Sequence, residues 1–455
     1  MEQSLYEHAI ENELKYYIET YGCQMNEHDS EKIAGLLQAV GYQKAEQMQQ
    51  ADLILFNTCC VRDHAEKKVF GNIGALKPLS QQKSGLIVAV CGCMMQQEEV
   101  AKKLMQTFPF VKIVFGTNNM NELPSMLYRA VMHRERVFNV QKANISSTAV
   151  EDVPMVRKKR PLATVNIMQG CDNFCTYCIV PYVRGREWSR PAEDILMEVK
   201  GLVKQGYREV MLLGQNVNSY GKKGGETSMD FADLLEQIAA GTGISRIRFM
   251  TSHPKDISKK LLEKIAGHEN ICKQLHLPVQ SGSSRVLMRM NRGYTREEYL
   301  RLVETAREIV PGIALTTDII VGFPGESEED YAQTLSLVRE VGYDAAFTFV
   351  YSPRKGTKAA EFPEQVPEQI KQQRIVRLIE LQSELTYESN LRYVGKKELI
   401  LVEDVSKKDE QSICGRTDSG KMVNFKGPKE KIGSFVPVEI LEAKRTTLLG
   451  RMLDA

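Results

Sequence analysis

The N-terminal third of the chain alternates unbroken apolar runs with helical stretches. Four runs predict strands, at residues 16–22, 51–57, 84–90 and 111–116. A helix is predicted to begin near Asp29-Ser30-Glu31 and to continue through the apolar residues 35–40. Apolar strands that alternate with helices are typical of a parallel sheet covered on both faces. We therefore predict an open parallel α/β domain over residues 13–130.

A second alternation follows residues 141–160, which lack an apolar period and are interpreted as a linker. Helical patterns separate its strands, and the capping box Thr295-x-x-Glu298 begins one of these helices. Repeated strand–helix units predict a complete or partial (β/α) barrel over residues 157–388, with its working face at the carboxyl ends of the strands. The predicted strands are residues 162–168, 209–214, 246–251, 274–279, 314–322 and 345–351.

The pattern changes again after residue 394, to short β-rich stretches broken by Gly and Pro. These stretches are residues 397–405, 420–427 and 434–443. They predict a small C-terminal β-barrel over residues 390–454. The predicted fold class is therefore α/β, with an open parallel domain, a partial (β/α) barrel and a small β-barrel.

Composition narrows the protein class. The 455 residues are 42% hydrophobic and 26% charged, with a formal net charge of +2, which suits a folded soluble protein without a global basic field. No apolar run approaches the roughly 18–20 residues needed to cross a bilayer. The acidic N-terminus lacks the order of a secretion signal, so we expect a cytoplasmic protein with no membrane partner. In that reducing compartment, ten cysteines favour metal binding or catalysis over disulfides.

The most specific chemical signal is Cys171-x-x-x-Cys175-x-x-Cys178, directly after the first strand of the predicted (β/α) barrel. Three thiolates in one loop can bind three irons of a [4Fe–4S] cluster and leave the fourth iron open to a small molecule. A zinc site usually needs four ligands, and no fourth Cys or His is nearby in the sequence. A ferredoxin-type run would add another cysteine in register. Three clustered cysteines in a polar loop also fit an inert core poorly.

A second group of cysteines follows the predicted strands of the N-terminal domain. Cys23, Cys59 and Cys93 each lie just beyond the carboxyl end of a strand, where open α/β sheets bind ligands. The three thiols are therefore expected to converge, although free cysteine is also a frequent core residue. Cys60 adjoins Cys59 and is expected to point elsewhere. Among the remaining cysteines, the role of Cys91 is ambiguous. Cys272 and Cys414 are interpreted as structural.

The cysteine loop at the mouth of a (β/α) barrel resembles the radical S-adenosylmethionine enzymes. The resemblance implies that the open iron binds S-adenosylmethionine and that one electron cleaves it to a 5′-deoxyadenosyl radical. The N-terminal cysteines, in the settings TYGCQMN, NTCCVRDHAEKKV and CGCMMQQ, resemble those of the methylthiotransferases within that superfamily. That family implies a second [4Fe–4S] cluster on Cys23, Cys59 and Cys93. Motif alignment favours Cys59 over Cys60 as the ligand, and the terminal barrel resembles the RNA-binding TRAM domain.

Further motifs resemble the methylthiotransferase branch that modifies isopentenylated tRNA. They are Gln24-Met25-Asn26, Val61-Arg62, SHPKD at 252–256 and HLPVQSGSSRVLMRMNRGYT at 276–295. The resemblance implies methylthiolation at C2 of N6-isopentenyladenosine 37, with one S-adenosylmethionine as methyl donor and another as radical source. It also implies the tRNA anticodon stem-loop and an unidentified electron donor as partners, and no DNA. Alternatives are threonylcarbamoyl-adenosine or a ribosomal-protein aspartate as substrate, or a non-enzymatic iron–sulfur RNA-binding protein.

Several polar residues at predicted strand ends are candidates for binding S-adenosylmethionine. Hydrogen bonds within a turn would explain the amide side chains at these positions equally well. By resemblance, Tyr177 packs against the adenine of the cofactor. Asp318 interrupts an apolar strand, and a buried carboxylate needs a partner such as an Arg or a ligand hydroxyl. The candidate cofactor-binding residues are Tyr177, Gln215, Asn216, Gln280 and Asp318.

Two basic regions are candidates for contact with RNA. In RGREWSR, Arg184 and Arg186 precede the only tryptophan, Trp188, and are expected to clamp phosphates while the indole stacks on a base. Residues 390–455 carry 13 Lys/Arg against 10 Asp/Glu, and this excess includes Lys426 and Lys429, with Phe425 as a stacking face. The alternative for each region is a merely solvated surface.

Overall fold

The computed structural model describes residues 2–60, 63–140, 153–157, 160–222, 229–407 and 409–453. The predicted linker thus lies largely outside the described residues, as do Val61 and Arg62. Contacts divide the chain into two compact units. The first contains residues 1–158 with the segments 169–172 and 179–188, and the second contains the rest, including the whole C-terminal barrel.

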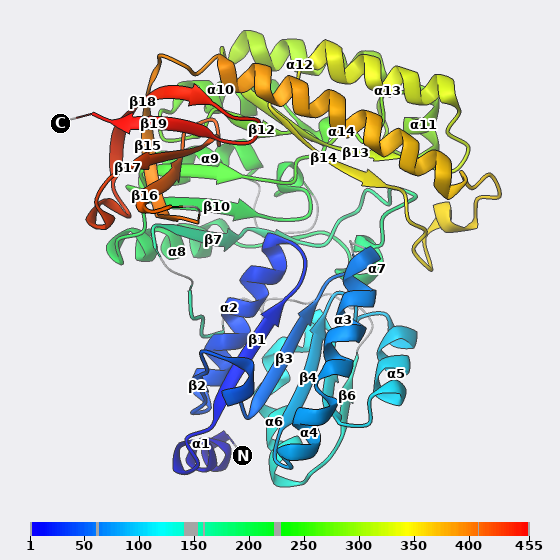
Figure 1. The fold of residues 1–455 in the computed structure, drawn as a ribbon, viewed down its shortest axis with the longest axis vertical. Coiled ribbons are helices and arrows are strands. Elements are labelled where there is room, and N and C mark those ends of the chain that lie inside the picture. Colours follow the sequence, from blue (N-terminus) through cyan, green and yellow to red (C-terminus); the bar gives the residue numbers. More distant parts are fainter. Residues whose placement is uncertain are drawn as a thin grey trace. The chain divides into compact units, whose positions relative to one another are not determined.

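A six-stranded parallel sheet forms the centre of the first unit (Figure 1). It contains the four predicted strands and adds two short edge strands that the sequence pattern did not predict. In spatial order the strands are β2 (Gln43–Lys44), β1 (Lys15–Thr20), β3 (Leu53–Thr58), β4 (Ile87–Gly92), β5 (Val111–Phe115) and β6 (Val137–Asn139).

Both faces of this sheet are covered, as the unbroken apolar strands predict. Along β3, Leu53 and Leu55 belong to one buried cluster, whereas Ile54 and Phe56 belong to another. The first cluster includes residues of α1 (Glu2–Glu11), α2 (Gln24–Ala39) and α6 (Leu123–Met132). The second includes residues of α3 (Asp63–Ala75) and α5 (Glu98–Thr107), with α4 (Lys77–Gln82) packed beside it.

The start of α2 corrects one prediction. The helix begins at Gln24 rather than near Asp29-Ser30-Glu31, with Cys23 as its N-cap in extended backbone. The polar residues at 29–31 look like a cap in the sequence, but all three are buried on the helix itself. As a result, Cys23 lies at the helix N-terminus, directly beyond β1.

The second unit contains the six strands predicted for the (β/α) barrel. They form two parallel three-stranded sheets, joined by a bridge between Ile247 and Ile271. In order the strands are β7 (Leu162–Asn166), β10 (Glu209–Leu213), β11 (Arg246–Phe249), β12 (Gln274–His276), β13 (Ala314–Val321) and β14 (Ala345–Val350). The result is a parallel partial barrel, as predicted.

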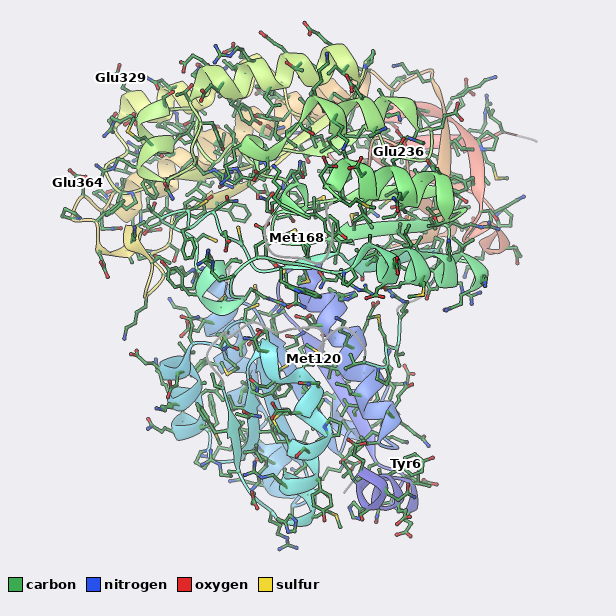
Figure 2. All side chains as sticks on the ribbon, turned by 180° about the vertical axis from the view of Figure 1, so that it is seen from behind. Tyr6, Met120, Met168, Glu236, Glu329 and Glu364 are labelled. Atoms are coloured by element: carbon green, nitrogen blue, oxygen red, sulfur yellow. The ribbon has the colours of Figure 1, made fainter. Side chains whose placement is uncertain are left out.

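Helices form the outer layer of this barrel (Figure 1). They are α8 (Ala192–Lys204), α9 (Phe231–Gly241), α10 (Lys259–Gly267), α11 (Ser284–Arg289), α12 (Arg296–Ile309), α13 (Glu328–Val341) and α14 (Glu368–Leu391). The predicted capping box at Thr295 begins α12. Polar side chains such as Glu236 and Glu329 project outward, whereas Met168 is fully buried (Figure 2). Short elements elsewhere in the chain are α7 (Val180–Val183), β8 (Met168–Gln169), β9 (Trp188–Ser189), η4 (Val217–Ser219) and η5 (Pro254–Asp256).

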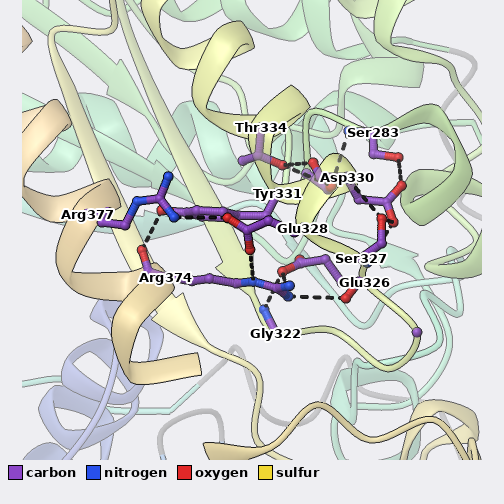
Figure 3. Close-up of polar contacts among 12 residues, drawn as sticks. Ser283, Gly322, Glu326, Ser327, Glu328, Asp330, Tyr331, Thr334, Arg374 and Arg377 are labelled. Atoms are coloured by element: carbon purple, nitrogen blue, oxygen red, sulfur yellow. Dashed lines mark hydrogen bonds and ion pairs between the residues drawn. The ribbon is translucent and has the colours of Figure 1, made fainter. Parts of the chain in front are cut away.

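A polar network fixes the loop between β13 and α13 (Figure 3). The buried Glu326 carboxylate accepts hydrogen bonds from the Gly322 N–H at 3.0 Å and from Arg374 of α14 at 2.7 Å. Asp330 accepts from the Ser283 hydroxyl at 2.6 Å and caps its own helix through Ser327. Donation by Arg285, Ser283 and Ser327 holds the pKa of Asp330 well below its usual range. The turn at residues 322–325 is therefore held to α14 through Glu326.

The C-terminal residues form the predicted closed barrel, β15 (Lys397–Ser406), β16 (Asp409–Arg416), β17 (Met422–Lys426), β18 (Phe435–Ala443) and β19 (Leu448–Met452). Two buried arginines of β11 dock it onto the (β/α) barrel. Arg246 donates to the Leu399 and Arg416 carbonyls, and Arg248 donates to the Asp418 carbonyl at 2.9 Å and to Thr417. Glu209 of β10 pairs with Arg248 at 2.8 Å.

In the described part of the chain, no helix has the length and apolarity to cross a membrane.

Candidate active site

The N-terminal cysteines lie at the carboxyl ends of neighbouring strands. Cys23 follows β1, Cys59 follows β3, and Cys93 follows β4. Gly22 has a φ of +116°, and a Cβ there would stand 2.4 Å from the Cβ of Cys59. Only glycine therefore allows Cys59 to approach the loop that carries Cys23.

Asn26 connects two of these cysteines. The thiols of Cys23 and Cys93 both lie within hydrogen-bond reach of its side-chain oxygen, at 3.7 and 3.9 Å. The Asn26 amide is fixed by donation to the Tyr21 and Thr58 carbonyls, each at 2.9 Å. The predicted convergence of cysteines from distant parts of the sequence is therefore present for this pair.

Arg184 completes this site, although the sequence analysis assigned it to RNA. Its guanidinium donates to the Cys93 sulfur at 3.0 Å, to Asn26 at 3.2 Å and to Asp29 at 2.7 Å. The residue is 7% exposed, so its cation is not available to a phosphate in this structure. The correction arises because segment 179–188 folds into the first unit instead of forming a solvated loop.

The thiols at this site form two pairs. Hydrogen bonding from Cys59 and the charge of Arg184 lower the pKa of Cys23 to about 6. Cys60 similarly lowers the pKa of Cys93, while its own pKa is raised by that contact and by burial. Cys60 thus points toward Cys93 rather than elsewhere, because the two successive cysteines follow the end of β3 and do not continue its pleat.

The Cys171-Cys175-Cys178 loop is divided between the two units. Cys171 belongs to the first unit, where its N–H donates to the Gly185 carbonyl at 3.2 Å. Cys175 and Cys178 belong to the second unit, and the Cys178 N–H donates to the Cys175 carbonyl at 2.9 Å. Among the described residues, no three His, Cys, Asp or Glu side chains gather around one metal ion. A [4Fe–4S] cluster does not need this, since each thiolate binds a different iron.

Arg292 is a residue that the sequence analysis missed. It is 4% exposed, and its guanidinium donates to the Cys175 sulfur at 3.3 Å, to Tyr177 at 3.4 Å and to the Pro278 carbonyl at 2.7 Å. Within the described part of the chain, Arg292 has no carboxylate partner; the acidic groups that act on it are Cys175 and the phenols of Tyr177 and Tyr294. A buried cation needs a counter-charge, and a Cys175 thiolate bound to iron would supply one.

Two strand ends of the second unit carry buried polar atoms that have no partner among the described residues. They are the Oε1 of Gln215 after β10, and the Oγ of Ser252 and Nε2 of His253 after β11. Burial and the nearby charges of Arg292 and Lys255 lower the pKa of His253, so the imidazole is neutral. Its Nδ1 accepts from the Lys255 N–H at 3.4 Å, which leaves Nε2 as an unpaired donor. Such atoms are satisfied when a polar ligand binds.

The other candidate cofactor-binding residues differ in their surroundings. Tyr177 packs against the cluster that contains Phe323 and Tyr351, and burial raises its pKa. Both amide atoms of Asn216 are used internally, by Asp256 at 2.7 Å and by the His253 N–H at 3.1 Å. The Asn216 side chain therefore stabilises the turns after the strands in this structure.

The last two of these candidates are Gln280, which follows β12, and Asp318, which lies on the neighbouring strand β13. Gln280 is buried with a φ of +71°, and its N–H donates to the Asp318 carbonyl at 2.9 Å. The Asp318 carboxylate lies 3.5 Å from the Nε2 of His276. That imidazole also hydrogen-bonds Thr316 at 3.0 Å, so both of its nitrogens have partners.

The remaining candidates for RNA contact are more exposed. Arg186 forms a two-pronged contact with Asp172, at 2.6 and 3.2 Å, yet its side chain is 65% exposed. Trp188 is half-buried in β9. Lys426 and Lys429 are exposed on the C-terminal barrel. Phe425 is not a stacking face: it is 2% exposed in the barrel core, because strand alternation turns it inward when Lys426 faces out.

Comparison with known proteins identifies the parts of the chain. Residues 165–338 match the Radical SAM superfamily, residues 15–116 match the uncharacterized protein family UPF0004, and residues 391–453 match the TRAM domain. A tRNA-2-methylthio-N(6)-dimethylallyladenosine synthase of Clostridium botulinum is 52% identical over 436 residues, 96% of each chain. That of Caldicellulosiruptor saccharolyticus is 52% identical over 96% of this chain and 92% of its own. The chain belongs to this family of synthases.

Solved structures show that the fold is shared more widely. The radical S-adenosylmethionine methyltransferase TsrM of Kitasatospora setae superposes with a TM-score of 0.55 at 14% identity, over 76% of this chain and 74% of its own. The cobalamin-dependent radical enzyme OxsB superposes with a TM-score of 0.52 at 14% identity, over 84% and 57%. The family's cofactors are S-adenosylmethionine and [4Fe–4S] clusters. Free thiols beside buried arginines and unpaired polar atoms at strand ends fit these groups.

Proposed function

We propose that this protein is a tRNA methylthiotransferase that adds a methylthio group to C2 of N6-isopentenyladenosine next to the anticodon. The observation that carries the proposal is that two cysteine groups each have a buried arginine at one sulfur, Arg184 at Cys93 and Arg292 at Cys175. Relatives at about half identity over nearly the whole chain are named as synthases of the 2-methylthio product in tRNA, which supports this substrate class.

The proposed ligands of the radical-forming cluster are Cys171, Cys175 and Cys178, and those of the auxiliary cluster are Cys23, Cys59 and Cys93. When bound, the clusters and S-adenosylmethionine supply electron transfer, a carbon radical and the methyl group. The chain's own residues hold and orient these groups. Arg292 donates to the Cys175 sulfur and would hold it in place for the cluster, and the half-buried Tyr177 offers an aromatic face.

Polar atoms at the strand ends would orient S-adenosylmethionine. We assign this role to the buried Gln215 oxygen, the Ser252 hydroxyl and the His253 N–H, because each lacks a partner among the residues that the structure describes and the cofactor carries amino, carboxylate and ribose groups. Gln280, which follows β12, and Asp318 on β13 are further candidates. A mouth lined in this way reaches a single base, so the tRNA adenosine must be unstacked from its loop.

The C-terminal barrel is proposed as a non-specific grip on the tRNA backbone. Lys426 and Lys429 lie exposed on it, and lysines there would contact phosphates without reading sequence. Arg186 and Trp188 are the corresponding candidates beside the cysteine loop. We place the protein in the cytoplasm with an electron donor that remains to be identified.

Nucleoside mass spectrometry of tRNA from a deletion strain tests the function. We expect loss of 2-methylthio-N6-isopentenyladenosine and accumulation of N6-isopentenyladenosine, restored by the wild-type chain and not by the Cys171, Cys175 and Cys178 triple alanine variant. Loss of a methylthiolated threonylcarbamoyl-adenosine, or of a modified ribosomal aspartate, would instead assign the alternative substrates. Unchanged nucleosides together with no reductive cleavage of S-adenosylmethionine would leave only an iron–sulfur RNA-binding protein.

A further inference from the structure

We propose that Arg184 is a positioning residue of the N-terminal cysteine site, where it holds the Cys93 sulfur and supplies the positive charge that favours a reduced cluster. The inference rests on the proposed function, because it assumes an auxiliary cluster on Cys23, Cys59 and Cys93. It reassigns a residue that the sequence pattern suggested for RNA.

The contacts of Arg184 are divided between sulfur and helix α2. Its Nε donates to Cys93 at 3.0 Å, while its Nη2 donates to Asn26 at 3.2 Å and to Asp29 at 2.7 Å. Asn26 and Asp29 are three residues apart, so they lie on one face of α2. One planar guanidinium therefore ties the loop after β4 to the helix that begins at Cys23.

Asp29 alone does not explain this geometry. A buried ion pair needs only that the two charges meet, and Arg184 and Asp29 have side chains that are each 5% exposed. The Nε of Arg184 instead donates to sulfur, and hydrogen bonds from a cation to a sulfur ligand are among the features that set cluster potential. The contact to Cys93 is what distinguishes a cluster residue from a structural ion pair.

Burial separates Arg184 from its neighbour in the same segment. Arg186 is two residues away and pairs with Asp172, but its side chain is 65% exposed and faces solvent. A tRNA phosphate can reach Arg186 and cannot reach Arg184 without opening the core. The two arginines of RGREWSR therefore have different roles.

The test measures the midpoint potential of the auxiliary cluster by redox titration followed with electron paramagnetic resonance. The parent is the full-length chain with Cys171, Cys175 and Cys178 changed to alanine, reconstituted with iron and sulfide. We expect about four irons in this parent. Arg184→Gln should lower the midpoint potential, because it removes a positive charge and a donor from a cluster sulfur, and should speed iron release to a chelator.

Asp29→Asn provides the more decisive comparison of midpoint potentials. It keeps Arg184 beside Cys93 and removes a negative charge, so the midpoint potential should rise, opposite to Arg184→Gln. A purely structural ion pair would make both substitutions act in the same direction, through loss of folding. Arg129→Gln is the matched control, since Arg129 pairs with Glu135 on the surface of the same unit, and it should leave the potential unchanged.

The outcomes separate this inference from the function on which it rests. A parent without iron overturns both the auxiliary cluster and the role of Arg184. A parent with about four irons, whose potential ignores both substitutions or shifts alike with both, overturns the role of Arg184 alone. If Arg184→Gln does not fold, the rise expected for Asp29→Asn still decides: a rise supports the role, and no rise overturns it.

Discussion

Two buried arginines stand beside cysteine sulfur in this protein, and their surroundings differ. Arg184 donates to Cys93 and also pairs with the Asp29 carboxylate. Arg292 donates to Cys175, and its other donors reach Pro278, Tyr177 and Tyr294, which are neutral when protonated. The charge of Arg184 is balanced by protein alone, whereas that of Arg292 depends on whatever anion binds beside it.

This difference assigns different tasks to the two sites. A balanced cation stabilises the site before and after a cluster binds, so the N-terminal site is largely preorganised. An unbalanced buried cation costs several kcal/mol until an anion arrives. We therefore expect the Cys175 region to gain more stability than the N-terminal site when its cluster binds.

The largest expected effect comes from removing each cysteine group in turn. Changing Cys171, Cys175 and Cys178 to alanine should halve the iron from about eight to about four per chain and abolish 5′-deoxyadenosine formation. Changing Cys23, Cys59 and Cys93 should also halve the iron but leave 5′-deoxyadenosine formation and abolish methylthiolation. Iron analysis and chromatography of the cleaved cofactor provide the readouts. Cleavage by the first variant would break the assignment of the two sites.

Substitution of Arg292 should have the next largest effect. Arg292→Gln removes the cation beside Cys175 and leaves the Pro278 carbonyl with a weaker donor, so S-adenosylmethionine cleavage should fall about 10- to 100-fold, at about 1.5–3 kcal/mol for a charged hydrogen bond. Arg292→Lys keeps the charge and should fall less. Single-turnover formation of 5′-deoxyadenosine measures the loss. Equal rates in wild type and Arg292→Gln would remove the contrast with Arg184.

The adjacent cysteines allow a finer test of the N-terminal site. Cys59→Ala should lose the auxiliary cluster and methylthiolation, while Cys60→Ala should keep both, because Cys59 is the proposed ligand and Cys60 only donates to Cys93. Iron content and product analysis of the two variants give the answer. The reverse pattern would exchange the roles of the two cysteines.

The smallest effect is expected on the C-terminal barrel. Lys426→Gln with Lys429→Gln should weaken tRNA binding modestly and reduce the salt dependence by about one unit of slope per lysine. Lys204→Gln with Lys259→Gln, at two exposed helical positions, is the control and should leave the slope unchanged. Point variants are preferable to deleting residues 390–455, because deletion would uncover Arg246 and Arg248. An unaltered slope would move the grip to Arg186 and Trp188.

Much of the fold could be predicted from the sequence because its strands are unbroken apolar runs with helices between them. The short strands β2 and β6 have no such signal, and α1 was missed as well. The cysteine groups could be found because spacing and strand ends point to them. The contacts of Arg184 and Arg292 with cysteine sulfur could not be predicted. An arginine in a polar segment is expected to lie on the surface, and only tertiary packing shows that it is buried. Arg292 had one available signal, its place in the NRGYT motif.

The order in which the chain is synthesised follows from the position of Arg184. The guanidinium that contacts Cys93 is 91 residues further along the chain. At typical translation rates of about 5–20 residues per second, Cys93 is made roughly 5 to 20 seconds before that arginine. During that interval the nascent site has its thiols and Asp29 but no cation. We therefore expect stable occupation of the proposed auxiliary site to be a late event, tied to completion of the segment that follows the second cysteine loop.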